Sequence, residues 1–152
     1  MTSDDPIRRN RAGWDGASEA YQRAHGATLA RTARAWGVWR IPERELGILG
    51  EVRGRDVLEL GCGAAAWTRA LADDGARAVG VDLSRRQLAH AQAGGLRLVQ
   101  GDAERLPFRD AAFDVVFCDH GATSFARPQR AVAEASRVLR SGGLLAFCMA
   151  TP

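Results

Sequence analysis

Two glycines and an aspartate stand at a spacing that suits a nucleoside-binding site. Gly61 and Gly63 follow an apolar run, and Asp82 lies about 20 residues further on, where dinucleotide-binding folds place a ribose-binding carboxylate. Glycines allow a sharp turn and bring a ligand close to main-chain N–H groups, and a carboxylate accepts two hydroxyl hydrogen bonds at once. A turn that binds nothing would also explain the glycines. For Asp82 the alternative is a helix cap, but Ser84 already supplies that cap.

Two further carboxylates indicate which kind of nucleoside the site would bind. Glu59 comes two residues before Gly61, where it would repel a pyrophosphate and attract the α-ammonium group of a methionine. Asp102 offers an acceptor to an exocyclic amine such as that of adenine. An NAD-linked oxidoreductase would account for the glycines and Asp82 but would leave Glu59 and Asp102 unexplained. These residue types therefore favour S-adenosylmethionine, with S-adenosylhomocysteine as the product.

Asp119 and His120 are the candidate catalytic residues. If the bound nucleoside is a methyl donor such as S-adenosylmethionine, methyl transfer from its sulfonium would be an in-line displacement, in which positioning and exclusion of water can supply most of the acceleration. A general base is needed only when the acceptor must lose a proton, and His120 is the candidate because an imidazole titrates near neutrality. The alternative is that both residues line the pocket or cap a loop.

The elements that must position these residues alternate along the chain. Helical spacing of Trp14, Ala17, Tyr21 and Ala24 predicts an N-terminal helix, and Pro42 is expected to lead a short helix over 43–49 that Gly50 closes. Apolar runs then predict five strands, at 57–60, 78–81, 96–99, 115–118 and 144–149. Helices are expected after the first and second strands, and from Pro128 to a stop at Gly142–Gly143. Arg97 predicts an edge position for the third strand, and the fourth is apolar on both faces and therefore central.

This order predicts an α/β fold with a doubly wound, mostly parallel, Rossmann-like sheet in the strand order 3-2-1-4-5. In such sheets ligands bind beyond the carboxyl ends of the strands, at the switch in strand order. The candidate residues fall at those ends. We expect residues 1–50 to form a helical cap segment and residues 51–152 to form the nucleoside-binding domain.

Composition limits the compartment and the partners. The 152 residues suffice for one compact unit and contain no apolar run near 18 residues, so no membrane span or membrane partner is expected. The polar N-terminus lacks a signal-peptide core, which predicts a cytoplasmic protein. All 21 basic residues are arginines scattered along the chain, so a nucleic-acid partner is not expected. Cys62, Cys118 and Cys148 form no Cys-x-x-Cys pair, which predicts free thiols and no metal site.

Several segments together resemble one family. Val57-Leu58-Glu59-Leu60-Gly61-Cys62-Gly63 is similar to motif I of class I S-adenosylmethionine-dependent methyltransferases, and Gly80-Val81-Asp82-Leu83-Ser84 to the acidic motif that follows it. The segments 101–108, 113–116 and 137–144 resemble the small-molecule subgroup related to ubiquinone and menaquinone biosynthesis. The likeness runs from about Asp56 to Met149. It implies methyl transfer to a small-molecule acceptor.

The resemblance also implies a role for each matching residue. Glu59 and the loop of Gly61, Cys62 and Gly63 would face the methionine part. Asp82 would hold the ribose while Leu83 packs on the adenine, and Asp102 and the Ala103 N–H would read the adenine edge. Asp119 would also border the cofactor. Tyr21 would reach it from the covering helix, unless it belongs to a core aromatic stripe. Ala65 stands where many relatives have a third glycine, which is tolerable if its φ is negative.

The family continues past strand five with a helix and an antiparallel hairpin, which this sequence lacks. Strand five would then be an uncharged sheet edge, prone to pairing. We therefore expect either a truncated form of a longer enzyme or a homodimer in which a second copy covers the edge. A non-catalytic S-adenosylmethionine-binding module is the remaining alternative.

Overall fold

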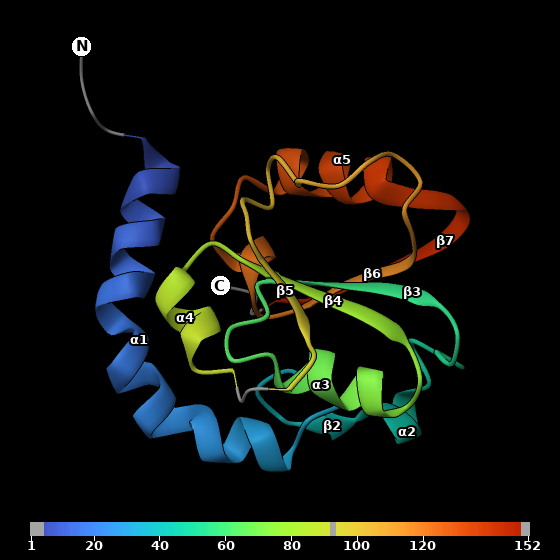
Figure 1. Cartoon of the computed structure of the whole chain (residues 1–152), viewed down its shortest axis with the longest axis horizontal. Coiled ribbons are helices and arrows are strands. Elements are labelled where there is room, and N and C mark those ends of the chain that lie inside the picture. The colour runs from blue at the N-terminus through green and yellow to red at the C-terminus, as the bar shows by residue number, and fades with distance from the viewer. Residues whose placement is uncertain (1–4, 92–93, 150–152) are drawn as a thin grey trace.

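A five-stranded parallel sheet forms the centre of the chain in a computed structural model that describes residues 5–91 and 94–149 (Figure 1). Its strands are β3 (Asp56–Leu60), β4 (Arg77–Asp82), β5 (Arg97–Gln100), β6 (Phe113–Asp119) and β7 (Leu139–Cys148). They lie in the order β5-β4-β3-β6-β7, and each neighbouring pair is parallel. Counted along the chain, this is the predicted order 3-2-1-4-5, so the α/β fold class is confirmed.

Helices cover both faces of the sheet. In Figure 1, α5 (Pro128–Val138) lies on one side of the sheet and α3 (Ala66–Asp73) on the other. The short helix α4 (Arg85–Ala89) connects β4 to β5, and Ser84 caps its N-terminus by accepting a hydrogen bond from the Gln87 N–H. The 3₁₀ turn η1 (Ala122–Ser124) follows β6. Strand order reverses between β3 and β6, so the switch point lies at the ends of these two strands.

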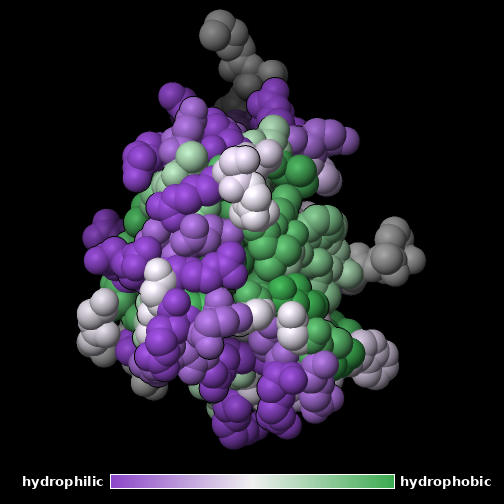
Figure 2. All heavy atoms as spheres, turned by 90° about the vertical axis from the view of Figure 1, so that its right-hand side faces the viewer, coloured by the Kyte–Doolittle hydropathy of each residue, from purple (hydrophilic) through white to green (hydrophobic). Residues whose placement is uncertain are grey.

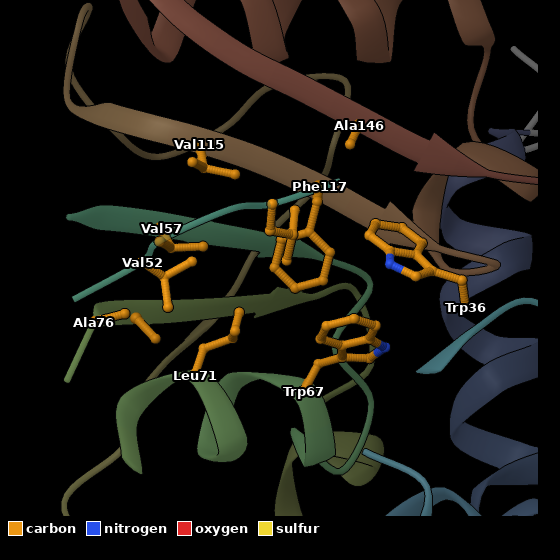
Figure 3. Packing of buried hydrophobic residues seen from close by; sticks show 11 residues of the cluster. Trp36, Val52, Val57, Trp67, Leu71, Ala76, Val115, Phe117 and Ala146 are labelled. Carbon is orange, nitrogen blue, oxygen red and sulfur yellow. The ribbon is translucent and has the colours of Figure 1, made fainter. Parts of the chain in front are cut away.

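Strands β3 and β6, in the middle of the sheet, are largely apolar on both faces because both faces are buried. On the α3 side, Val57, Val115 and Phe117 pack with Trp67 and Leu71 (Figure 3). The ring centroids of Trp67 and Phe117 lie 5.2 Å apart, and Trp36 completes this aromatic group. A second cluster forms on the α5 side, from Leu58, Leu60, Val116, Cys118, Ala135 and Val138 among others. Successive residues of β3 and β6 thus alternate between two cores.

The N-terminal segment folds against the sheet domain. Helix α1 (Pro6–Arg31) contains the predicted helix and extends well beyond it, and it stands beside α4 (Figure 1). The connector forms a small antiparallel pair, β1 (Ala35–Trp36) with β2 (Ile41–Pro42). Trp36 and Leu49 are buried in the same cluster as residues of the sheet. None of the helices in the described ranges is both long and apolar enough to cross a bilayer.

Two predicted helix ends are wrong. The helix expected over 43–49 is α2 (Glu43–Leu46), which ends at Gly47 with a φ of 62°. The Glu43 carboxylate accepts a hydrogen bond from the Leu49 N–H, and that bond holds the chain after the turn. The last helix stops at Val138 and not at Gly142–Gly143. Those glycines lie inside β7, where Phe113 pairs with Leu139 but Val115 with Leu144, so extra residues of β7 bulge there.

Both predicted sheet edges are confirmed. The strand that bears Arg97 lies at one edge, and β7 lies at the other. On β7 the Phe147 side chain is 51% exposed. Figure 2 views the molecule from the right-hand side of Figure 1 and shows a continuous apolar area bordered by polar residues. Pairing of β7 with a second copy stays a prediction.

Candidate functional site

One cavity opens at the carboxyl ends of the strands, at the switch point. Its volume is about 980 Å³. It is lined by every residue that sequence analysis selected for cofactor binding or catalysis: Tyr21, Glu59, Gly61, Cys62, Gly63, Asp82, Leu83, Asp102, Ala103, Asp119 and His120. These residues come from α1 and from the ends of four strands, so the fold brings together segments far apart in the sequence.

The turn after β3 forms the floor of the cavity. Gly61 has a φ of 71°, and a Cβ there would lie 2.3 Å from the main-chain N of Ala122. Glycine is therefore required at this position both by its backbone conformation and by the close approach of the loop after β6. Gly63 also has a positive φ, of 54°. The sharp turn predicted from the two glycines is present.

Ala65 does not meet the condition of a negative φ under which alanine would cost little. Its φ is 62° and its ψ is 34°, the left-handed conformation. A side chain in this conformation costs about 1 kcal/mol relative to glycine, because Cβ approaches the carbonyl oxygen. Ala65 lies at the N-terminus of α3 and provides no side-chain cap. The backbone at Ala65 therefore has the left-handed conformation that glycine adopts readily, although the residue is an alanine.

Asp82, at the end of β4, is fixed by main-chain donors. Its Oδ2 accepts a hydrogen bond of 2.8 Å from the Gly63 N–H, and its Oδ1 accepts one of 2.8 Å from the Ser84 N–H. A carboxylate has about four acceptor positions, so these two bonds leave about two for ligand hydroxyls. Burial raises the pKa of Asp82. Asp82 thus supports the turn and the start of α4 as well as lining the cavity.

Glu59 is the most buried carboxylate in the site. Its Oε2 accepts hydrogen bonds from the Thr68 N–H (2.9 Å) and the Thr68 hydroxyl (2.6 Å). Thr68 lies in the first turn of α3, so Glu59 provides the cap that Ala65 cannot provide. Burial raises the pKa of Glu59 to about 8, against the opposing effect of the two hydrogen bonds from Thr68. A cation in the cavity would favour its ionised form.

The residues after β4 and β5 form one end of the cavity. Leu83 offers an apolar side chain, and its main-chain oxygen accepts a hydrogen bond from Gln100. Asp102 Oδ1 accepts a hydrogen bond of 2.9 Å from the Glu104 N–H. Ala103 beside it is buried. This end combines a flat apolar contact with one further acceptor, as an adenine requires.

Helix α1 forms a wall that sequence analysis identified only in part. Trp14 packs edge-on against Tyr21 and against Phe125, with ring centroids 5.4 and 5.1 Å apart. All three residues line the cavity. Burial raises the pKa of Tyr21. The helical spacing of Trp14 and Tyr21 was visible in the sequence, whereas Phe125 had no signal because it follows β6 in an irregular loop.

A pair of glutamines links α1 to α4 over the turn. Gln22 donates a hydrogen bond of 2.8 Å to the side-chain oxygen of Gln87. Gln87 is almost fully buried and lines the cavity, and within the described residues its Nε2 has no hydrogen-bond partner. A buried donor without a partner is costly, so an acceptor on a ligand would stabilise this arrangement.

Asp119 holds the small β1–β2 hairpin against the site. Its carboxylate accepts hydrogen bonds from the Gly37 N–H (2.8 Å), the Trp67 indole (3.2 Å) and the Arg40 guanidinium (3.3 Å). The side chain is only 6% exposed. Three donors from the hairpin and from α3 thus engage the Asp119 carboxylate. Arg40 also lines the cavity and was missed, because its approach depends on the fold of the connector.

His120 has a φ of 54°, an uncommon conformation for a residue with a side chain. Its N–H donates a hydrogen bond to the Cys148 main-chain oxygen, and its Nε2 lies 3.5 Å from the Cys148 Sγ. The side chain also lines the cavity. Its imidazole is therefore placed at the cavity wall by the pairing of β6 with β7.

The residues present fit a nucleoside that carries a charged amino-acid tail. Asp82 has acceptor positions left for hydroxyls, and Leu83 and Ala103 form an apolar slot for a base. Glu59 suits an ammonium group and Arg40 a carboxylate. The Gln87 Nε2, which has no hydrogen-bond partner among residues 5–91 and 94–149, could donate to an acceptor on the ligand.

Comparison with known proteins gives a consistent result. The family described as "Methyltransferase domain" matches residues 58–147. The chain is 40% identical over 110 residues to demethylmenaquinone methyltransferase of Mycobacterium tuberculosis (strain ATCC 25618 / H37Rv), covering 72% of this chain and 46% of that protein. It is also 40% identical over 105 residues to phthiotriol/phenolphthiotriol dimycocerosates methyltransferase 1 of Mycobacterium ulcerans, covering 64% and 38%. The chain spans about half the length of the curated relatives it matches.

Solved structures agree with this result. An S-adenosylmethionine-dependent methyltransferase from Mesorhizobium loti superposes with a TM-score of 0.61 at 26% identity, over 67% of this chain and 50% of that one. Phosphoethanolamine N-methyltransferase 1 of Haemonchus contortus, solved with phosphoethanolamine and S-adenosylhomocysteine, gives a TM-score of 0.74. That alignment covers 98% of this chain and 33% of the other, and at 20% identity it supports the fold alone.

Proposed function

The chain belongs to the class I S-adenosylmethionine-dependent methyltransferase family, and from this premise we propose that it transfers a methyl group from S-adenosylmethionine to a small-molecule acceptor. One observation carries the proposal: the residues selected from the sequence for this cofactor all line a single cavity at the switch point. Family membership leaves no support for the NAD-linked oxidoreductase alternative.

We assign a part of the cofactor to each region of the cavity. Asp82 would accept hydrogen bonds from the ribose hydroxyls, and Leu83, Asp102 and Ala103 would surround the adenine. Glu59 would lie near the methionine ammonium group. Arg40, which is only partly exposed, would pair with the carboxylate. This orientation points the sulfonium toward the end of the cavity that His120 and the aromatic residues of α1 border.

The protein's own contribution to the reaction would be positioning and exclusion of water. When bound, S-adenosylmethionine supplies an electrophilic methyl group on a positively charged sulfur. Trp14, Tyr21 and Phe125 would hold the acceptor in line and keep water out. Where the acceptor is a hydroxyl, His120 would take its proton. Asp119 would keep the hairpin closed over the site and would not act on the acceptor.

The aromatic wall favours an apolar, ring-bearing acceptor. Aromatic side chains bind flat apolar groups by stacking and edge contacts. Two of the similar proteins are a demethylmenaquinone methyltransferase and a phthiotriol/phenolphthiotriol dimycocerosates methyltransferase. We therefore propose an acceptor of this chemistry for the present chain.

Two measurements test the function. Titration calorimetry with S-adenosylmethionine, S-adenosylhomocysteine and NAD should show binding of the first two and none of the third. Mass spectrometry should then detect methylated product from a panel of quinols and phenols. Cofactor binding without any methylated product would support the non-catalytic module, and NAD binding would overturn the proposal.

A further inference from the structure

The ends of β6 and β7 bring together three side chains to which the proposed function assigns no part of the cofactor. Asp119 and Cys148 are paired residues of the two parallel strands, and the His120 N–H donates to the Cys148 main-chain oxygen. One ligand-type atom from each of Asp119, His120 and Cys148 lies within 4.8 Å of the other two. An oxygen, an imidazole nitrogen and a thiol sulfur form a donor set suited to a divalent transition metal. The sequence analysis predicted no metal site, because these residues come from two strands and form no Cys-x-x-Cys motif.

The spacing of the imidazole and the thiol matches metal coordination. Zinc bonds to a histidine nitrogen at about 2.0–2.1 Å and to a cysteine sulfur at about 2.3 Å, so tetrahedral coordination separates the two ligand atoms by about 3.6 Å. The His120 Nε2 and Cys148 Sγ are 3.5 Å apart. These two atoms could therefore bind one ion without rearrangement. The Asp119 oxygen lies within 4.8 Å of both atoms, so it would approach by at most about 1 Å to reach a similar separation.

Gly37 leaves space beside this pair. A Cβ on Gly37 would lie 3.2 Å from the Cys148 Sγ and 3.6 Å from the His120 Nε2, so a side chain there would fill the position next to both atoms. Gly37 has a φ of 67° and its N–H holds Asp119, which fixes the hairpin around this space. Gly37, Asp119 and His120 all line the cavity, from which an ion or a fourth ligand can arrive.

We propose that Cys148, His120 and Asp119 form a zinc site at the wall of the cavity, with water or a cavity ligand in the fourth position. Binding forms a zinc–sulfur bond and releases the thiol proton to solvent, while zinc keeps its oxidation state. Cys148 and His120 are the two principal ligands. Asp119 joins after giving up its longest contact, the one to Arg40.

Such an ion would compete with the use of His120 as a base. A lone pair of the Nε2 engaged by zinc cannot accept a proton from an acceptor. The site therefore provides a means by which a transition metal would inhibit methylation of hydroxyl acceptors. It rests on the three side chains alone, and it stands whether or not the chain is an active methyltransferase.

Cobalt(II) and zinc(II) themselves are the probes that test the site. We expect the full chain to bind one equivalent of Co²⁺ with a thiolate-to-cobalt charge-transfer band, and Zn²⁺ to displace it. Cys148→Ser should remove the band, and His120→Ala should weaken binding about tenfold or more, since loss even of an outer partner costs 10–100-fold. Cys118→Ala, which removes a thiol buried in the core cluster on the α5 side of the sheet, should retain band and affinity.

The outcomes separate this inference from the proposed function. Binding of S-adenosylhomocysteine to each variant, measured by calorimetry, reports whether the cavity is intact independently of the metal. A band that survives in Cys148→Ser, or Co²⁺ affinity equal in wild type and His120→Ala, would overturn the zinc site and leave the cofactor proposal untouched.

Discussion

The main-chain N–H of Gly63 donates a hydrogen bond of 2.8 Å to the carboxylate of Asp82. This bond connects the turn after β3 to the end of β4, two segments that the sequence separates by a helix and a strand. It explains why a glycine turn and an acidic residue occur together, because the turn fixes the rotamer of the acid. The carboxylate is therefore already oriented before a ligand enters.

Replacing Asp82 should weaken nucleoside binding. Asp82→Ala removes the acceptors for the ribose hydroxyls, so we expect the binding free energy of S-adenosylhomocysteine to weaken by about 1–3 kcal/mol. The substitution also removes the acceptors for the Gly63 and Ser84 N–H groups, so we expect a lower melting temperature. Asp82→Asn keeps one oxygen and should lose less of both. Calorimetry and thermal unfolding measure the two effects. An unchanged dissociation constant in Asp82→Ala would exclude the ribose role.

Replacing Ala65 by glycine should stabilise the protein. Ala65 has a φ of 62°, so Ala65→Gly should raise the free energy of unfolding by about 1 kcal/mol, less the entropy that glycine adds to the unfolded chain. Ala70→Gly, inside the same helix, is the control and should cost about 1 kcal/mol. Chemical denaturation measures both. If both variants lose stability equally, the left-handed conformation of Ala65 is wrong.

Alanine substitutions at Gly61 and Gly54 should distinguish the stability cost of a positive φ from the cost of steric crowding. Both have a φ of 71°, but a Cβ on Gly54 meets nothing within 4 Å, whereas one on Gly61 meets the Ala122 N at 2.3 Å. Gly54→Ala should cost about 1 kcal/mol, the price of the conformation alone. Gly61→Ala should cost about 1–3 kcal/mol more, because main-chain atoms must move, and should reduce cofactor affinity. Equal losses in the two variants would contradict the contact between the loops after β3 and β6.

The sequence alone was enough to predict the strands of the sheet and the candidate residues at the strand ends. Strands such as Val115–Cys118 are recognisable because burial of both faces requires an unbroken apolar run. Once the strands are located, the acidic residues that follow them can be assigned to the carboxyl ends of the strands. The features that could not be predicted from the sequence depend on how the elements lie relative to one another in the fold. The pairing of Asp119 with Cys148 requires the register of two strands, and Arg40 enters the site only through the hairpin fold. The sequence left the sign of the Ala65 φ open, and the value of 62° depends on the turn around that residue.

The edge strand β7 offers a test of self-association. Its Phe147 is half exposed beside unpaired main-chain groups, so a second copy that pairs there should be disrupted by a charge. Light scattering should report a dimer for the wild-type chain and a monomer for Phe147→Lys. Val132→Lys places the same charge on the exposed surface of α5 and should leave the dimer intact. A wild-type monomer would contradict the prediction.

Burial of Glu59 should make stability depend on pH. Its pKa rises to about 8 in the folded chain from 4.5, so between these values the folded state holds a proton that the unfolded state lacks. The stabilising contribution is therefore complete below about pH 4.5 and is lost as pH rises toward 8, with a slope of at most about 1.4 kcal/mol per pH unit. Glu59→Gln keeps an acceptor for Thr68 but cannot ionise. Chemical denaturation of wild type and this variant at several pH values isolates the contribution of Glu59, because the other ionisable groups are common to both.

The protonation state of Glu59 should also affect cofactor binding. Cofactor affinity should rise with pH, whereas the stability contribution of Glu59 falls. A methionine ammonium group favours the ionised Glu59, so binding near pH 7 must expel a proton, and affinity should rise with pH until about 8 and then level off. Calorimetry of S-adenosylhomocysteine in buffers of different ionisation enthalpy measures the released proton directly. Glu59→Gln should bind without this release. If wild type and variant release the same number of protons, the carboxyl group that changes state on binding is not Glu59.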